Sequence, residues 1–272
     1  MRLSRFVMLG ICAAVFSGCG KDDVTAPSLP PLSQVRFINA LSDTGAVDIH
    51  AVDQVNLSPI ANNLPFRQGT QYFPTAAGVR HFRIFLTSKD INVTSVVMAD
   101  ENITLPEGKR LTLLLSGSAR AGTTSLWMID DSADPPPAGQ VGVRLVNAGS
   151  GIVNGYVVNT ATTPLPGTET FSSVGTLTFS PYFDRATGPA AVRVTDAGST
   201  TVNASAAGPS APTTLPGEKP AAGVTQEGTN FSVYYFSAGA AGSANASVTT
   251  PGLVWFVDRN PCDEPAVAAC AP

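Results

Sequence analysis

The sequence predicts an all-β protein made of two tandem antiparallel β-sandwiches, of immunoglobulin-like or transthyretin-like type. The first observation behind this prediction is an internal repeat. The segment Val35-Arg36-Phe37-Ile38-Asn39-Ala40 returns as Val143-Arg144-Leu145-Val146-Asn147-Ala148, 108 positions later (143 − 35). The second observation is that short β-rich runs separated by turn residues follow each copy, with no run that reads as a long helix. Self-similarity over this distance indicates a duplicated domain of about 100 residues.

The repeat divides the chain into six predicted parts. These are a lipoprotein signal peptide (1–18), a lipid-anchored tether (19–33), a first β-sandwich (34–131), a proline-rich linker (132–140), a second β-sandwich (141–259) and a C-terminal tail (260–272). Strands of the first sandwich are expected at 47–52, 79–86, 93–99, 110–116 and 125–130. Longer loops distinguish the second copy, because Gly, Pro, Ala, Ser and Thr concentrate in 196–229 and 238–251.

The N-terminus has the three parts of a signal peptide. Met1 to Arg5 carries two positive charges, an apolar run of eleven residues follows, and Ser17-Gly18 supplies the small residues expected before a cleavage site. Phe16-Ser17-Gly18-Cys19 resembles the lipobox of bacterial lipoproteins, in which acylation of Cys19, with palmitate among the acyl chains, provides a membrane anchor. An ordinary secretory signal with a chance cysteine is the alternative. We therefore expect a lipid-anchored protein of the bacterial cell envelope, at the outer membrane, with exposure on the cell surface left open.

Composition limits the partners of this chain. Of its 272 residues 43% are hydrophobic and only 13% are charged, which is typical of an exported β-protein. The formal net charge of −4 becomes about −6 once Arg2 and Arg5 leave with the signal peptide. Because no cluster of Lys or Arg remains elsewhere, nucleic acid is not expected as a partner.

The linker combines charge with stiffness. Asp130, Asp131 and Asp134 stand close to three successive prolines, so we expect a semi-rigid spacer that holds the sandwiches apart as separate beads. Clustered carboxylates raise the alternative of a Ca²⁺ site, but no glycine turn or bidentate Glu has the spacing of a calcium loop. A solvated charged linker is the favoured interpretation, with no metal and no cofactor.

A family resemblance appears at Asn39-Ala40-Leu41-Ser42-Asp43-Thr44-Gly45-Ala46-Val47-Asp48-Ile49. This segment looks like the start of the bacterial domain of unknown function DUF4397, and the resemblance extends over both predicted sandwiches. It implies a β-rich, exported, often lipid-anchored and often tandem protein, and it implies no activity. The second copy departs from the first, with Asn154 in place of Asp48 and Tyr156 in place of His50.

The chain offers few residues for catalysis. It has two histidines, His50 and His81, which alternate with apolar neighbours and read as solvent-facing strand residues. No sequence motif of a hydrolase, a metalloprotease or a phosphate-binding loop occurs. The chain is therefore predicted not to be an enzyme. A surface for a ligand is the remaining hypothesis, with the candidates Asp43, Asp48, His50, Tyr156 and Tyr234. For Tyr234, packing in the core is favoured over exposure.

Two cysteines remain outside the signal and the anchor. Cys262 and Cys270 form an even pair outside the cytoplasm, which predicts a disulfide. Together these features predict a non-catalytic structural or binding module of the envelope, with an envelope polysaccharide or protein as the partner. A carbohydrate-binding or adhesive surface module is the first alternative, and an enzyme of unrecognised type is the second.

The two tryptophans carry the last expectation. Aligning 126–130 with 254–258 places Trp127 on Trp255 and Asp130 on Asp258. Apolar residues lie on both sides of these closing strands, which is typical of a central strand that is covered on both faces. We therefore expect each tryptophan to anchor the core of its own sandwich.

Overall fold

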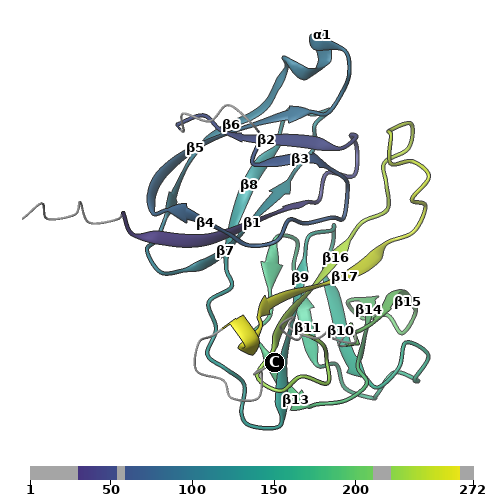
Figure 1. The fold of residues 1–272 in the computed structure, drawn as a ribbon. Helices are drawn as coiled ribbons and strands as arrows, with labels where there is room; N and C mark the ends of the chain where they lie inside the picture. The colour runs from purple at the N-terminus through teal and green to yellow at the C-terminus, as the bar shows by residue number, and fades with distance from the viewer. Residues whose placement is uncertain (1–29, 54–58, 211–221, 264–272) are drawn as a thin grey trace, which may run out of the picture. The chain divides into compact units, whose positions relative to one another are not determined.

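The computed structural model describes residues 30–53, 59–210 and 222–263 (Figure 1). The predicted signal peptide, the lipobox with Cys19 and nearly all of the tether lie outside these residues, as does Cys270. The described residues from Pro31 onward belong to one compact unit. Strands dominate it, so the prediction of an all-β sandwich fold is confirmed.

The first sandwich consists of two four-stranded sheets, with the orders β4-β1-β7-β8 and β3-β2-β5-β6. Their bounds are β1 Leu32–Asn39, β2 Val47–Ala51, β3 Ala61–Leu64, β4 Phe73–Ala76, β5 Gly78–Leu86, β6 Val97–Leu105, β7 Arg110–Ser116 and β8 Ser125–Asp130. Phe37 and Leu113 from one sheet meet Ile49 and Phe82 from the other in a single buried cluster. Period-2 alternation produces this core, because successive side chains of a strand point to opposite faces.

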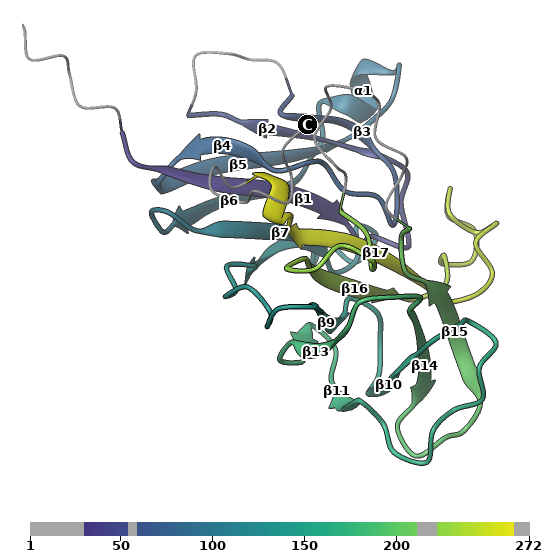
Figure 2. The ribbon, with the colours of Figure 1, turned by 60° about the horizontal axis from the view of Figure 1, so that its bottom comes forward.

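The second sandwich follows the same plan. Its sheets have the orders β11-β10-β14-β15 and β12-β9-β16-β17, and β13 also pairs with β9. Their bounds are β9 Gln140–Asn147, β10 Val153–Val158, β11 Phe171–Val174, β12 Thr178–Phe179, β13 Phe183–Ala186, β14 Ala191–Asp196, β15 Val202–Ala207, β16 Asn230–Phe236 and β17 Gly252–Arg259. Figure 2 shows β10, β14 and β15 side by side in one of these sheets.

Each sandwich contains one parallel pair of strands within otherwise antiparallel sheets. The opening strand β1 pairs in parallel with β7, and β9 pairs in parallel with β16. Both opening strands therefore lie inside their sheets and are covered on both faces. This explains why the repeated motif is mostly apolar, with Arg36 and Asn39, and their counterparts Arg144 and Asn147, as the exceptions.

One predicted strand begins later than expected. The segment 93–99 was expected to be extended, but Ile91–Thr94 forms a short helix, α1, and β6 starts at Val97. Asp90 caps the helix, because its side chain accepts a hydrogen bond from the Asn92 N–H. The β-branched residues of this segment favour a strand by intrinsic propensity. The N-cap at Asp90 nevertheless starts a helical turn here, and the strand begins only after it.

A separate buried cluster of apolar side chains lies between the two sandwiches. Ile38 and Leu114 of the first sandwich pack with Val146, Tyr234 and Phe236 of the second. The prediction that the linker keeps the sandwiches apart as beads is therefore wrong. Sheets β4-β1-β7-β8 and β12-β9-β16-β17 each bury one face in their own sandwich and the other face against the neighbouring sandwich.

The closing strands are not central strands. Both β8 and β17 end their sheets, so the expectation that they lie in the middle is wrong. Trp127 is half-buried in the cluster between the sandwiches and its ring lies 6.0 Å from that of Phe179. Trp255 instead packs against the core of the second sandwich, beside Phe231. Only Trp255 lies against the core of its own sandwich, as expected of both tryptophans.

The two tryptophans differ because they do not occupy matching positions. The sequence alignment that paired them is shifted by one residue from the register of the strands. Strand pairing sets Thr112 opposite Ile129 and Ser232 opposite Phe256, so Trp127 corresponds to Val254 and not to Trp255. Because neighbouring residues of a strand point to opposite faces, a shift of one position moves a side chain from the interface to the core.

Candidate functional site

Two buried arginines mark the most unusual site in the described chain. Arg36 on β1 and Arg144 on β9 are each 2% exposed. Both alternate with core residues such as Val35 and Val143, so their side chains leave the opposite face of the sheet, toward the other sandwich. A buried guanidinium requires hydrogen-bond acceptors for its N–H groups and a compensating charge.

Arg36 finds its acceptors in both sandwiches. Its Nε donates to Thr112 Oγ1 at 2.6 Å, in its own sandwich. Its Nη1 donates to the Val257 carbonyl at 2.9 Å and its Nη2 to Asp258 Oδ1 at 2.5 Å, both in the second sandwich. A longer contact of 3.4 Å joins Nη2 to Asp131 Oδ2.

Arg144 makes equivalent bonds, reaching from the second sandwich to the first. Its Nε donates to Ser232 Oγ at 2.7 Å, in its own sandwich. Its Nη1 donates to the Asp130 carbonyl at 3.1 Å, and its Nη2 donates to Asp131 Oδ1. Each arginine thus binds a hydroxyl of its own sandwich and a carboxylate at the end of the other sandwich's closing strand, with Asp131 directly after β8 and Asp258 in the last two residues of β17. We call this arrangement the reciprocal clamp, made of Arg36, Arg144, Asp131 and Asp258.

Hydroxyl groups complete the coordination of the two carboxylates. Tyr72 donates to Asp131 and Tyr182 donates to Asp258, each at 2.6 Å. Thr112 and Ser232 add bonds of 2.5 Å to Asp131 and Asp258. Both carboxylate side chains are 0% exposed. Two positive and two negative charges balance, so the clamp buries ions without leaving one uncompensated.

Burial and charge act against each other in the clamp. Burial lowers the pKa of Arg36, but the interactions with Tyr72, Asp131 and Asp258 prevail and raise that pKa well above its ordinary value. Burial raises the pKa of Asp131, and the neighbouring Asp258 adds to this rise against the effect of Arg36 and Arg144. The pKa of Tyr72 and that of Tyr182 are both raised, first by burial. The raised pKa values of Arg36, Tyr72 and Tyr182 favour the protonated forms that donate the observed hydrogen bonds, whereas Asp131 accepts its bonds as a carboxylate.

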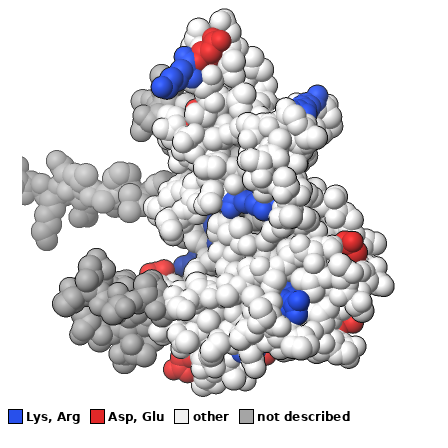
Figure 3. All heavy atoms as spheres, turned by 90° about the vertical axis from the view of Figure 1, so that its right-hand side faces the viewer, with Lys and Arg blue, Asp and Glu red and all other residues white. Residues whose placement is uncertain are grey.

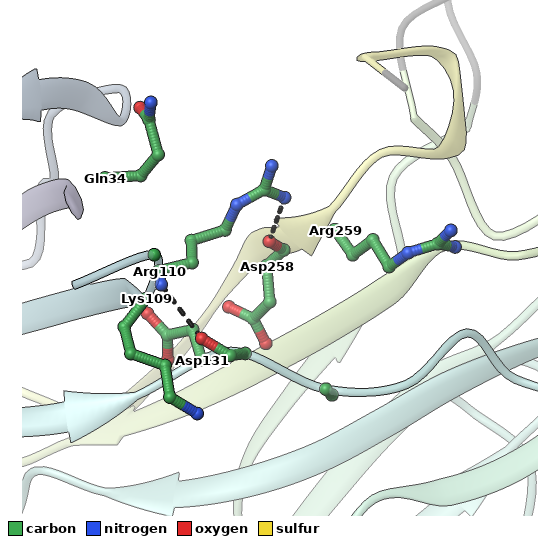
Figure 4. Close-up of a pocket in the computed structure, with 9 residues that line it drawn as sticks. Gln34, Lys109, Arg110, Asp131, Asp258 and Arg259 are labelled. Carbon is green, nitrogen blue, oxygen red and sulfur yellow. Dashed lines mark hydrogen bonds between the residues drawn. The ribbon is translucent and has the colours of Figure 1, made fainter. Parts of the chain in front are cut away.

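A small opening of about 220 Å³ lies beside the clamp (Figure 4). Lys109, Arg110 and Arg259 are among the residues that line it, together with Asp131 and Asp258. Arg110 closes part of it by donating from Nη1 to the Asp258 carbonyl at 2.7 Å. The side chains of both aspartates are 0% exposed, so their carboxylates do not face solvent in the opening.

The structure corrects the interpretation of the linker. Asp131 is 1% exposed and belongs to the clamp, so a solvated charged linker is wrong at this position. Asp130 points the other way and pairs with Lys109 at 3.0 Å. The linker aspartates therefore do not converge on a Ca²⁺ site. Among the described residues, no group of three or more His, Cys, Asp or Glu side chains is placed to hold a metal ion.

The residues predicted for a ligand surface do not come together. Asp43 accepts bonds from Ser118, Ala119 and Arg120 and so holds the loop between β7 and β8. The side chain of Asp48 accepts from the Asn63 N–H and the Thr87 hydroxyl, and His50 lies edge-on to Phe85 at 5.2 Å.

The two tyrosines of that proposed surface are not on the surface. Tyr156 is 7% exposed. Tyr234 is 0% exposed and lies in the cluster between the sandwiches. The interpretation of Tyr234 as a packed side chain agrees with this placement. Cys262 is buried in a short 3₁₀ turn. Its expected partner Cys270 lies outside the described residues, so the disulfide remains a prediction.

The clamp was only partly visible in the sequence. Its arginines are the charged members of the repeated opening motif, so the repeat is the sequence signal that points to them. Its carboxylates were missed because Asp130, and not Asp131, was set against Asp258. The pairing of Arg36 with Thr112 and of Arg144 with Ser232 in neighbouring strands gives the correct register, with Asp131 matching Asp258.

Charge is sparse on the surface. Figure 3 shows one face of the molecule, on which uncharged residues predominate and acidic and basic side chains are scattered. This agrees with a charged fraction of 13%. None of the helices in the described part of the chain is both long enough and apolar enough to span a membrane.

Comparison with protein families supports the resemblance noted in the sequence. Residues 33–154 match the family model of the domain of unknown function DUF4397. The match covers the first sandwich and the start of the second. No curated protein matches the chain.

Two solved structures are similar to the chain at low scores. One is CBMbc (family CBM26) from Eubacterium rectale Amy13K in complex with maltoheptaose. Its identity is 9%, the match covers 85% of this chain and 99% of the other, and the TM-score is 0.25. The other has the description "Alpha-glucan binding by a streptococcal virulence factor". Its identity is 13%, the match covers 62% of this chain and 83% of the other, and the TM-score is 0.20. At such TM-scores these similarities carry no inference about what this chain binds.

Proposed function

We propose that this protein is a non-catalytic module of the bacterial cell envelope, anchored through Cys19, in which two β-sandwiches joined into one unit present a binding surface. The observation that carries the proposal is the reciprocal clamp. Arg36 and Asp258 pair at 2.5 Å, with side chains 2% and 0% exposed. The shortest ion pairs of the clamp, Arg36 with Asp258 and Arg144 with Asp131, therefore run between the two sandwiches.

The clamp supports a structural role over a catalytic one. Strongly shifted pKa values often mark catalytic groups, and the pKa values of Arg36 and Tyr72 are raised well above their ordinary values. Catalysis also requires contact with a substrate, whereas both carboxylates are fully buried and bonded to arginine and hydroxyl donors. The chemistry of the cluster is therefore used to join the sandwiches.

The anchor is tested by comparing the full chain with its Cys19→Ala variant in a Gram-negative host. The wild type should incorporate labelled palmitate and fractionate with the outer membrane, and the variant should appear as unlabelled protein free of membranes. Ser17→Ala, which keeps a small residue before the cysteine, is the matched control and should behave as the wild type. A wild-type protein that carries no label and is free of membranes would overturn the proposed anchor.

A further inference from the structure

A groove in the second sandwich is separate from the clamp's opening. It lies between the edge strand β11 of one sheet and β12 with the following loop of the other, and its volume is about 370 Å³. We call it the β11–β12 groove. Its lining consists of residues 170–174 and 178–183, none of which is charged. We infer that this groove binds an uncharged sugar chain, which would supply the ligand class of the binding module proposed above and so rests on that function.

Two exposed aromatic rings are the main feature of the groove. Phe179 is 44% exposed and Phe183 is 43% exposed, and both belong to the lining. Aromatic faces stack on the C–H faces of sugar rings, and such rings lose little conformational freedom on binding if they are already held. Exposed apolar surface that gathers in one groove, as these two rings do, often marks a ligand-binding site.

Neighbouring side chains hold both rings in place. The guanidinium carbon of Arg144 lies 5.0 Å from the centre of the Phe179 ring, and Trp127 contacts the same ring from the first sandwich at 6.0 Å. Phe183 lies edge-on to Phe171 at 6.5 Å. The clamp thus supports one of the two rings, so joining the sandwiches also shapes the groove.

Hydroxyl groups alternate with these rings. Ser172, Ser173 and Thr178 are exposed in the lining. Thr178 donates its hydroxyl hydrogen to the Gly175 carbonyl at 2.7 Å, which leaves its oxygen able to accept a bond from a ligand. Neutral donors and acceptors beside apolar rings match the alternating surface of a sugar, whereas an ionic ligand would find no opposite charge.

The first sandwich shows that the fold does not require this groove. Thr70 of the first sandwich corresponds to Ser180 of the second. The hydroxyl oxygen of each accepts a hydrogen bond from the opening strand, from the N–H of Phe37 and of Leu145 respectively. The residue before Thr70 is Gly69, where the second sandwich has Phe179. A Cβ on Gly69 would meet Phe256 Cε1 at 2.6 Å, so that place is already filled by the other sandwich.

The counterpart of the second ring is also occupied. Phe73 takes the place of Phe183 at the start of the matching strand and is half-buried, stacked on Phe37 at 5.9 Å. The exposed aromatic pair therefore belongs to the second sandwich and is no consequence of the fold.

An extended peptide is the other ligand that edge strands suggest. Strand addition requires a continuous row of backbone groups along the edge. Here β12 has only two residues, and Pro181, which has no N–H, interrupts the edge before β13. A peptide strand would thus form few ladder hydrogen bonds, which favours the sugar chain.

The test is calorimetric titration of the purified full chain, in a non-glycosidic detergent, with maltohexaose, cellohexaose and hexa-N-acetylchitohexaose. At least one probe should bind. Phe183→Ala should weaken that binding at least tenfold, Phe183→Tyr should keep it within about threefold, and Ile152→Ala, which truncates an exposed residue of the same sandwich, should leave it unchanged. Phe179→Ala should also weaken binding, with circular dichroism as the check that the variant is folded.

Three outcomes would overturn the inference: no heat from any probe at millimolar concentration, binding that survives loss of both rings, or binding only of an extended decapeptide. Mass spectrometry of the recovered sugars separates this inference from the proposed function. Cleaved sugars would contradict the non-catalytic module and leave the groove assignment standing. Intact sugars with no binding would contradict the groove and leave the module.

Discussion

Arg36 of the first sandwich and Asp258 of the second form a buried ion pair, with 2.5 Å between Nη2 and Oδ1. Arg144 and Asp131 form the same pair in the opposite direction. Because the shortest ion pairs run between the sandwiches, separating them would leave only the longer contacts within each one, at 3.4 Å for Arg36 with Asp131 and 3.8 Å for Arg144 with Asp258. The stability of either sandwich should therefore depend on the other.

Replacing Arg36 by Met removes one charge of the clamp while keeping a side chain of similar length. Asp131 and Asp258 would then share only Arg144, and the free energy of unfolding should fall by about 3 to 5 kcal/mol. Urea denaturation followed by circular dichroism measures the loss. The matched control is Arg83→Met, because Arg83 pairs with Asp100 on the surface and should contribute less than about 1 kcal/mol. Equal losses of unfolding free energy in the two variants would show that the clamp contributes no more to stability than a surface ion pair.

Coupling between the sandwiches can be tested from a distance. Phe82 is 2% exposed in the first core, and Phe82→Ala should cost about 3 to 5 kcal/mol. In a Trp127→Phe background, the fluorescence of Trp255 reports on the second sandwich. The unfolding midpoint seen by Trp255 should fall together with that of the whole chain. An unchanged Trp255 midpoint would mean that the sandwiches unfold independently, as beads on a linker would.

Gly69 is a steric contact point between the sandwiches. A Cβ at this position would meet Phe256 Cε1 at 2.6 Å and the Phe37 carbonyl oxygen at 3.2 Å. Gly69→Ala should therefore destabilise the protein by about 1 to 3 kcal/mol through overpacking. Gly175→Ala is the control, since its nearest atom would be Thr178 Oγ1 at 3.6 Å, an ordinary contact. Thermal melts of the two variants compare them, and similar melting temperatures would argue against close packing at Gly69.

Tyrosine ionisation should limit stability at alkaline pH. Burial raises the pKa of Tyr72, Tyr182 and Tyr234 above the ordinary value of 10.0. A raised pKa means that the stabilisation is fully present below pH 10 and is lost as pH rises above it, because the unfolded chain releases these protons first. Absorbance at 295 nm should show a late, cooperative step that coincides with unfolding. Tyr72→Phe should make stability less dependent on pH in this range, and gradual ionisation of the folded protein would contradict the prediction.

Asp43 should produce a smaller effect at acid pH. Partial burial favours its neutral form, but bonds from the Ser118 hydroxyl and from the N–H groups of Arg120 and Ala119 prevail and lower its pKa below the ordinary 3.8. The stabilisation is therefore present above pH 3.8 and is lost as pH falls through the lowered pKa. Hydrogen exchange of the loop that follows β7 should accelerate over this interval. In Asp43→Asn the exchange rate should no longer change with the carboxylate titration, after correction for intrinsic exchange.

The sequence by itself determined the all-β class and the strands with clear alternation. Phe82 and Ile84 alternate with polar neighbours because one face of β5 meets the core, and such a pattern is written in the order of residues. The repeated opening motif was equally visible. It placed Arg36 and Arg144 at matching positions, because a duplicated strand keeps its inward and outward faces.

Only the tertiary structure decided what the arginines and tryptophans do. An arginine between apolar residues reads as exposed until a second sheet covers it, and that sheet comes from residues more than 200 positions away at Asp258. The roles of Trp127 and Trp255 depended on strand register, in which one residue separates the interface from the core. Local sequence contains no measure of this register, because hydrogen bonds between distant strands and the packing of two sheets set it together.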